Sequence, residues 1–164
     1  MVAASPRQLF WRRFRKETTA IVGLAIIILF ALLALLAPLV SPYDIAVAAD
    51  GKVWMTHELG VVRLDPATGL TQGMYPLGTD KQIQTLDIAG NGMIWMSDAN
   101  ERIFRLDPAT LSFTTFAIPA ATFPGGCGAF GIKVAPGGDI FFACTMNRSI
   151  GRLQPAGPTW TRFG

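Results

Sequence analysis

The chain has 164 residues, enough for one modest domain and an accessory segment. Its formal charge of +3 lies entirely in residues 1–44, because nine basic residues balance nine acidic ones from residue 45 onward. A neutral segment with scattered charges lacks the basic stripe that phosphate contacts need, which excludes nucleic acid as a partner.

Residues 20–40 form an uncharged apolar run of 21 residues. At ~1.5 Å per residue, a helix of this length crosses a ~30 Å hydrocarbon core. We predict a basic cytoplasmic arm over residues 1–19 and a transmembrane helix over residues 20–41, which binds the lipid bilayer through residues 20–40. A cleaved signal peptide is the alternative, but its apolar region is normally only ~7–15 residues long.

The flanks of the apolar run predict its orientation. Five basic residues precede the run, whereas Lys52 is the first basic residue after it. The positive-inside rule therefore places the N-terminus in the cytoplasm and residue 45 onward outside it.

The N-terminal sequence resembles a known family. The residues are R-Q-L-F-W-R-R-F-R-K (7–16), the A-L-L-A-L-L-A-P-L-V ending of the apolar run (31–40) and S-P-Y-D (41–44). Together they resemble the N-terminus of dipeptide/oligopeptide ABC transporter permeases. The resemblance implies a first transmembrane helix in the bacterial inner membrane, followed by entry into the periplasm or extracellular space. No further span follows Asp44, so we expect no translocation pathway from this chain alone.

From residue 45 onward, three units repeat. The segment A-D-G-K-V-W-M-T (49–56) matches A-G-N-G-M-I-W-M-S (89–97) and P-G-G-D-I-F-F-A (136–143). The segment V-V-R-L-D-P-A-T-G (61–69) matches I-F-R-L-D-P-A-T-L (103–111) and, more loosely, I-G-R-L-Q-P-A-G (150–157). A period of 40–50 residues with several short strands per unit is typical of a β-propeller.

We therefore predict an all-β fold of about three four-stranded β-propeller blades, preceded by one transmembrane α-helix. The blades are expected at about 45–78, 83–119 and 130–164, within a β segment of 45–164. The middle blade is predicted to contain strands 83–88, 93–97, 102–107 and 112–117, and Asn91-Gly92 predicts a tight hairpin between the first two.

The aromatic residues Trp54, Trp95 and Phe141 occupy the same place in each unit, and we expect them to pack between blades. Propellers typically close with about 4–8 blades, so three blades form an incomplete propeller. We expect a fragment of a larger propeller, or one whose ring is closed by further blades or protomers.

The repeated elements G-x-(I/L)-W-(F/M)-(T/S) and I-x-R-(L/I)-D-P-A-T-G over residues 45–164 resemble the virginiamycin B (streptogramin) lyase family of β-propellers. That resemblance implies a C–O lyase that opens a cyclic peptide lactone with a histidine base and Mg²⁺. No cofactor is evident from the residues themselves, so Mg²⁺ is expected only if the chain is such a lyase. The family's motif at this strand end runs Glu-x-His, whereas the order here is His57-Glu58.

The candidate site residues follow the second strand of each unit, where loops gather on one face of a propeller. His57 and Glu58 are the catalytic candidates, because His57 is the sole histidine of the chain. The ligand-binding candidates are Asp98, Asn100, Asn147 and Arg148. The alternative for all six is that they are exposed polar residues or turn caps.

The cysteines Cys127 and Cys144 lie in no metal-binding spacing. They are predicted either to form a disulfide, which an extracytoplasmic location allows, or to be two small half-buried side chains. Gly125-Gly126-Cys127-Gly128 resembles a phosphate-binding loop, but we expect it to connect two blades.

Three functions remain open. The first is a membrane-anchored extracytoplasmic propeller segment that binds a ligand or a protein partner. The second is a Mg²⁺-dependent lyase, and whether the chain is an enzyme at all stays undecided by its sequence. The third is a membrane component related to peptide ABC transporter permeases.

Overall fold

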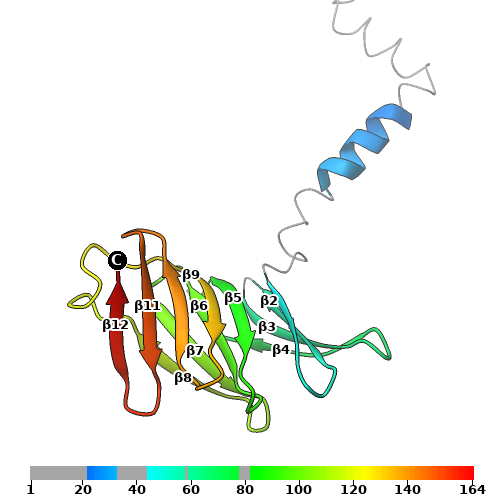
Figure 1. Cartoon of the computed structure of the whole chain (residues 1–164). Coiled ribbons are helices and arrows are strands. Elements are labelled where there is room, and N and C mark those ends of the chain that lie inside the picture. Colours follow the sequence, from blue (N-terminus) through cyan, green and yellow to red (C-terminus); the bar gives the residue numbers. More distant parts are fainter. Residues whose placement is uncertain (1–21, 33–43, 58, 78–81) are drawn as a thin grey trace, which may run out of the picture. The chain divides into compact units, whose positions relative to one another are not determined.

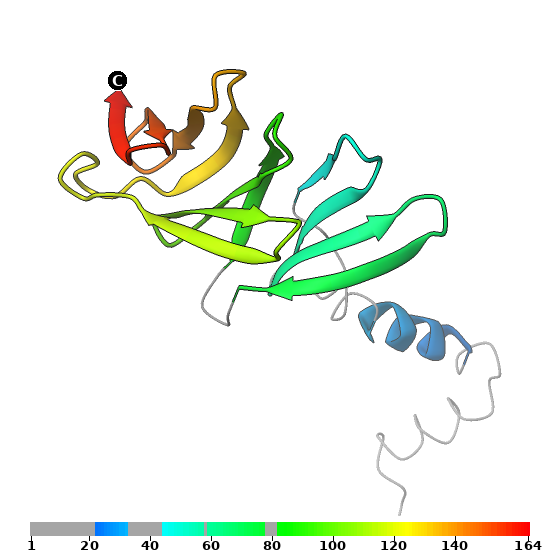
Figure 2. The same cartoon turned by 90° about the horizontal axis from the view of Figure 1, so that it is seen from below.

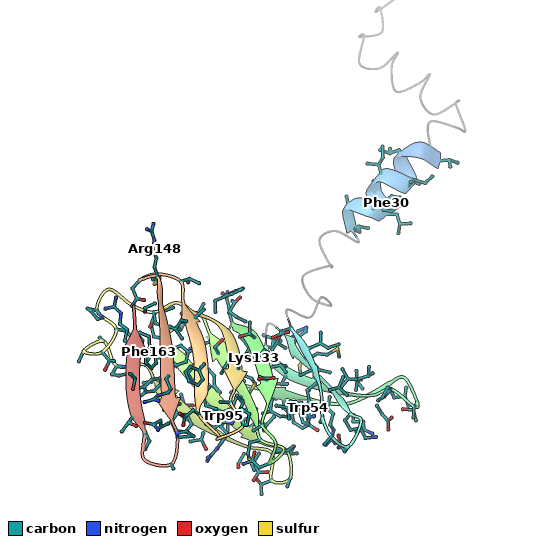
Figure 3. All side chains as sticks on the ribbon, viewed as in Figure 1. Phe30, Trp54, Trp95, Lys133, Arg148 and Phe163 are labelled. Carbon is teal, nitrogen blue, oxygen red and sulfur yellow. A yellow bond between two sulfur atoms is a disulfide. The ribbon has the colours of Figure 1, made fainter. Side chains whose placement is uncertain are left out.

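The chain divides into two units, Met1–Val40 and Ser41–Gly164. The structure, a computed structural model, describes residues 22–32, 44–57, 59–77 and 82–164 (Figure 1). In the first unit, residues 22–32 are α-helical, and every side chain of this helix is apolar. Its large side chains are exposed, Phe30 at 65% (Figure 3). Within the four described ranges, no helix combines the length and hydropathy needed for a membrane span. The remainder of the predicted span and the basic arm lie outside the described residues.

The described part of the second unit is made of three antiparallel sheets of four strands, which we call blades 1 to 3. This confirms the predicted all-β fold of three four-stranded units, and strand order follows chain order in each blade (Figures 1 and 2). The strands are β1 (Ile45–Val47), β2 (Val53–His57), β3 (Gly60–Asp65) and β4 (Leu70–Pro76) in blade 1; β5 (Ile83–Ile88), β6 (Ile94–Asp98), β7 (Arg102–Asp107) and β8 (Ser112–Ala117) in blade 2; and β9 (Ala129–Val134), β10 (Ile140–Cys144), β11 (Ser149–Gln154) and β12 (Thr159–Phe163) in blade 3.

The blades follow one another along their first strands. β1 lies against β5, and β5 lies against β9. In Figure 2 the three sheets are seen in chain order, from cyan through green to red. We call the face of each sheet that is directed at the following blade its forward face, and the opposite face its rear face.

The three blades meet at two internal junctions, between blades 1 and 2 and between blades 2 and 3. At each junction the forward face of one blade packs on the rear face of the next, and both faces are buried. Blade 1 contributes Trp54 and Val61, which pack with rear-face side chains of blade 2 such as Phe104. Blade 2 contributes Trp95 and Ile103, which pack with rear-face side chains of blade 3. Further members on the rear faces are Leu86, Ile94, Met96 and Leu106 in blade 2, and Ile132, Ile140, Phe142 and Leu153 in blade 3. Two apolar clusters, one for each junction, therefore make up the core of the blades as far as the structure describes them.

The predicted packing of the three equivalent aromatic residues holds for two of them. Trp54 and Trp95 are 2% and 3% exposed. Phe141 has the same position in blade 3 but is only half-buried. Phe141 lies on the forward face of blade 3, and no described residues form a blade that follows this face. The aromatic ring is therefore covered on one side only.

Carboxylates also join the blades. Asp44 accepts a hydrogen bond from the backbone N–H of Leu86 in the next blade at 3.0 Å. The backbone N–H of Val134 donates to Asp87 at 2.8 Å across the second junction. Asp44 is fixed in turn by Thr56 of β2, whose hydroxyl accepts a hydrogen bond from the Asp44 N–H at 2.7 Å. These bonds set the position of one blade relative to the next.

The Asp-Pro-Ala-Thr turns between the third and fourth strands repeat in detail. Asp65 accepts a hydrogen bond from the Ala67 N–H, and Asp107 accepts one from the Ala109 N–H, both at 2.9 Å. The hydrogen bond from the Lys52 ammonium lowers the pKa of Asp65, and the bond from the Ala109 N–H lowers that of Asp107. A carboxylate that accepts such bonds is favoured in its charged form.

These two turns predict a loss of stability in acid. The pKa of each carboxyl group is lower in the folded state than in the unfolded state. Its contribution to the free energy of unfolding is therefore fully present above the unfolded-state pKa of about 3.9, and it is lost as the pH falls through the folded-state pKa. We expect the double variant Asp65→Asn/Asp107→Asn to show a shallower fall of Tm below about pH 4 than the parent chain. Thermal unfolding followed by circular dichroism would measure this.

Gln154 provides the control, because it occupies the equivalent position in blade 3 and does not titrate. The variant Gln154→Asn should keep the parent's dependence of Tm on pH. Parallel Tm curves for the parent chain and the double variant would contradict the prediction.

Candidate functional site

The predicted site residues are placed at one end of the blades, where the loops after the second strands emerge. We call this the loop end: it comprises the β2–β3, β6–β7 and β10–β11 loops together with the first residues of β5 and β9. His57, Asp98 and Asn147 lie there on three successive blades, with Asn100 and Arg148 in the same loops. Figure 3 shows Arg148 pointing away from the sheets at this end.

His57 is the last residue of β2, where it pairs with Gly60 across a two-residue loop. The backbone N–H of Leu59 donates a hydrogen bond to its Nδ1 at 3.3 Å. This bond assigns the acceptor role to Nδ1 in the neutral imidazole. Glu58, the other catalytic candidate, lies outside the described residues.

Asp98 is fully buried and organises the β6–β7 loop. Its Oδ1 accepts hydrogen bonds from the N–H groups of Asn100 and Arg102, both at 2.9 Å. Its Oδ2 accepts a hydrogen bond from Arg102 Nε at 2.6 Å. Both carboxylate oxygens are therefore engaged by the protein in the arrangement that the structure shows.

The glycine-rich segment that resembled a phosphate-binding loop connects β8 to β9, as expected, and binds a carboxylate of the chain itself. Glu101 accepts hydrogen bonds from the Cys127 N–H at 2.8 Å and from the Gly128 N–H at 2.7 Å. Glu101 has a φ of 61°, an uncommon left-handed conformation for a residue other than glycine. The anion that these backbone N–H groups bind is thus supplied from 26 residues earlier in the chain.

Cys127 and Cys144 form a disulfide, with their Cα atoms 4.3 Å apart. The bond joins the β8–β9 connector to the end of β10. Phe123, in the same connector, is fully buried, and its ring contacts those of Phe142 and Trp160. The connector is therefore attached to blade 3 by a covalent bond and by aromatic packing.

The β10–β11 loop carries the last two candidates. Asn147 accepts a hydrogen bond from the Ser149 hydroxyl at 2.5 Å, while its Nδ2 is buried and has no acceptor among the described residues. Arg148 is exposed and, with a φ of 54°, is left-handed like Glu101. Such backbone conformations cost about 1–3 kcal/mol and occur often at ligand-binding loops.

A cleft of about 270 Å³ opens at the loop end between blades 2 and 3. Phe130 and Met146 are 53% and 69% exposed, so much of the lining is apolar and accessible. Gln84 adds one polar side chain. The remaining lining residues are Ala99, Gly128, Ala129 and Thr145.

Sequence reasoning missed these cleft residues and Glu101. Phe130 and Met146 belong to none of the repeated sequence elements, and neither is adjacent to a pair of titratable residues. The sequence therefore gives no signal for them. The role of Glu101 depends on a contact with Cys127, which no local pattern encodes. A clue was available in the glycine-rich segment, since several exposed backbone N–H groups require an anion.

The described residues at the loop end do not fit a Mg²⁺ site. Among residues 22–32, 44–57, 59–77 and 82–164, no three His, Cys, Asp or Glu side chains are grouped so as to hold a metal ion. The oxygen atoms of Asp98 and Glu101 already accept hydrogen bonds from the protein. A hard cation needs about six oxygen ligands, which this arrangement does not offer.

The N-terminal residues match a known family. Residues 5–56 match the N-terminal TM domain of oligopeptide transport permease C. The match begins in the basic arm and ends within β2, so it overlaps the first two strands of blade 1. It covers less than half of the chain. No curated protein matches the chain.

The blades are similar to solved propellers. The virginiamycin B lyase from Staphylococcus aureus aligns with a TM-score of 0.63 at 26% identity, over 74% of this chain and 40% of that one. A streptogramin B lyase aligns with a TM-score of 0.66 at 27% identity, over 76% and 41%. A catalytically inactive form of the S. aureus enzyme with quinupristin aligns with a TM-score of 0.63 at 22% identity, over 74% and 40%, which shows the fold alone.

The chain thus spans about two fifths of the length of these lyases. Both suspected resemblances are confirmed, each for its own part of the chain. An N-terminal segment similar to a permease transmembrane domain is joined to three blades similar to those of streptogramin lyases.

Proposed function

We propose that this chain is a membrane-anchored, extracytoplasmic propeller segment that binds a peptide-like ligand at the loop end. The observation that carries the proposal is the cleft between blades 2 and 3, with exposed Phe130 and Met146 in its lining. Exposed apolar side chains grouped at a hollow of the surface are typical of ligand sites.

The size of the cleft favours one large side chain of a ligand over a whole small molecule. Its volume of about 270 Å³ is slightly below the usual range of about 300–1,000 Å³ for small-molecule pockets. Methionine adapts its shape to an apolar partner, and the Gln84 amide offers a hydrogen bond to a peptide group. The resemblance to streptogramin lyases supports cyclic peptide lactones as a ligand class.

The proposed location follows from four features of the chain. The match to a permease TM domain and the exposed apolar helix 22–32 support attachment to a bacterial inner membrane. The basic residues before the span support a cytoplasmic N-terminus. The Cys127–Cys144 disulfide supports an oxidising compartment, such as the periplasm, for the blades.

Quinupristin is a suitable first probe of the cleft, with the full chain held in mild detergent. We expect Met146→Asp to weaken binding at least tenfold in isothermal titration calorimetry, because a carboxylate would be placed against an apolar part of the ligand. Leu111→Asp is the matched control: Leu111 is 44% exposed in the β7–β8 hairpin, at the opposite end of blade 2. Equal affinities for the two variants, or no heat of binding with the parent chain, would contradict the proposal.

A lyase is the second candidate, supported by the 26% and 27% identity to the two lyases. Turnover of the same probe, followed by mass spectrometry, separates it from binding alone. A lyase should lose activity with EDTA and with His57→Ala, whereas a binding protein should show no turnover under any condition.

A transport role is the third candidate, supported by the match over residues 5–56. Co-purification of the full chain with a second permease subunit and an ATPase would favour it. Purification without either would favour the binding role.

A further inference from the structure

The two outer faces of the three-blade unit are the two halves of a junction that the chain already makes twice. At both internal junctions a forward face packs on a rear face, and the equivalent residues Val61 and Ile103 are fully buried there. Ile150 has the same position on the forward face of blade 3 and is 53% exposed. Phe163, paired with Ile150 on β12, is 44% exposed.

No described residue covers the rear face of blade 1 either. Ile45 and Val47 are 58% and 65% exposed, and Met74 is 45% exposed. The residue at the position of Ile45 in blade 2 is Leu86, which is 1% exposed because blade 1 covers it. Within residues 44–57, 59–77 and 82–164, one forward face and one rear face are therefore unmatched, and each has the apolar character that its counterpart needs.

We propose that a second copy of this chain fills both faces. The forward face of blade 3 packs on the rear face of blade 1 of the partner copy, and the reverse contact forms at the same time. Counting the described blades alone, two copies give six, which lies inside the range of about 4–8 at which propellers close. A two-fold rotation repeats the same head-to-tail contact on the other side, so both outer faces of the described blades are covered.

Charge complementarity favours this partner. Arg63 lines a cleft with Asn91 of the following blade's first hairpin. Arg105 lines the equivalent cleft with Gly137 and the acidic Asp139 of blade 3. Arg152 has the equivalent place in blade 3. In the partner copy, the residue of the first hairpin at that position is Asp50, which is exposed.

At the hairpin position of Asn91 and Gly137, the junction between two copies would have an acidic residue in place of a neutral one. The Nε of Arg152 is buried without a partner among the described residues, as is that of Arg63 at an internal junction. The Arg152 guanidinium donates to Gln154 and Thr161 and is 3.7 Å from Asp139 of its own blade. The guanidinium can therefore approach Asp50 of the partner without breaking a short ion pair.

The test is the mass of the full chain in mild detergent, measured by size-exclusion chromatography with light scattering. We expect the parent chain to have twice the mass of the 17.7 kDa chain. Ile150→Asp and Arg152→Glu should each yield single chains, and the charge exchange Arg152→Glu/Asp50→Arg should restore the dimer. Leu111→Asp, at an exposed apolar position outside both faces, should leave the dimer intact.

Circular dichroism of each variant confirms that a single-chain mass does not come from unfolding, and Arg152→Glu changes only a partly exposed side chain. A parent mass of one chain, a mass above two chains, or a dimer that survives both single variants would overturn the proposal. Met146→Asp separates this proposal from the proposed ligand site, since it should weaken quinupristin binding without changing the mass.

Discussion

Replacing Trp95 with alanine is expected to lower the free energy of unfolding by about 3–5 kcal/mol, the usual cost of deleting a large aromatic side chain from a core. Trp95 is 3% exposed in the cluster between blades 2 and 3. Its ring lies 5.5 Å from that of Phe116, and the Arg105 guanidinium lies 5.9 Å above it. The variant therefore loses aromatic and cation–π contacts as well as buried apolar area.

The chain provides a matched control for this result in Phe141, at the same position of blade 3. Because Phe141 is only half-buried, Phe141→Ala should cost about 1–2 kcal/mol in dilute protein. Urea denaturation of the full chain, followed by circular dichroism of the strands, would measure both values. If a second copy covers Phe141, its cost should rise with protein concentration. Equal costs for Trp95 and Phe141 in dilute protein would contradict the difference in burial.

Asp98→Ala is expected to have an effect of similar size, about 3–5 kcal/mol, which is the usual cost of removing one partner of a buried ion pair. The carboxylate is fully buried, and it accepts three hydrogen bonds from Asn100 and Arg102 within the β6–β7 loop. The alanine variant removes this shared acceptor from a region with little solvent. Asp98→Asn keeps an oxygen acceptor and should cost less than half as much.

The control for Asp98 is Asp139, whose side chain is 30% exposed and 3.7 Å from Arg152. Exposed ion pairs contribute about 0–1 kcal/mol, so Asp139→Ala should be nearly neutral in urea denaturation. A small effect of Asp98→Ala would show that the β6–β7 loop does not depend on this carboxylate.

Most of the strand pattern of blade 2 could be predicted from its sequence. The predicted strands 83–88, 102–107 and 112–117 agree with β5, β7 and β8, because apolar alternation and the Asp-Pro turn mark their ends. The predicted second strand, 93–97, begins and ends one residue earlier than β6, which is Ile94–Asp98. Met93 remains in the turn, where its N–H donates to the Asn91 side chain, and Asp98 extends the ladder by pairing with Ile83.

The sequence predicts where the candidate site residues lie in the fold, but it does not predict which atoms their side chains contact. Strand order alone brings His57, Asp98 and Asn147 to one end, because the second strand of every blade ends there. Whether a carboxylate faces a ligand or the protein depends on contacts distant in sequence, such as that between Glu101 and Cys127. Periodicity carries no information on such pairs. The catalytic and ligand-binding roles of these residues stay predictions.

The position of Asp44 has a mechanical consequence under the membrane attachment proposed above. It is the first described residue of the second unit, and it is bonded both to Thr56 in its own blade and to Leu86 in the next. A pull on the N-terminal segment would reach Asp44 before any other described residue of the blades. The force would then be divided between blades 1 and 2 at their junction. The hydrogen bonds of Asp44 would therefore oppose the separation of β1 from the rest of blade 1.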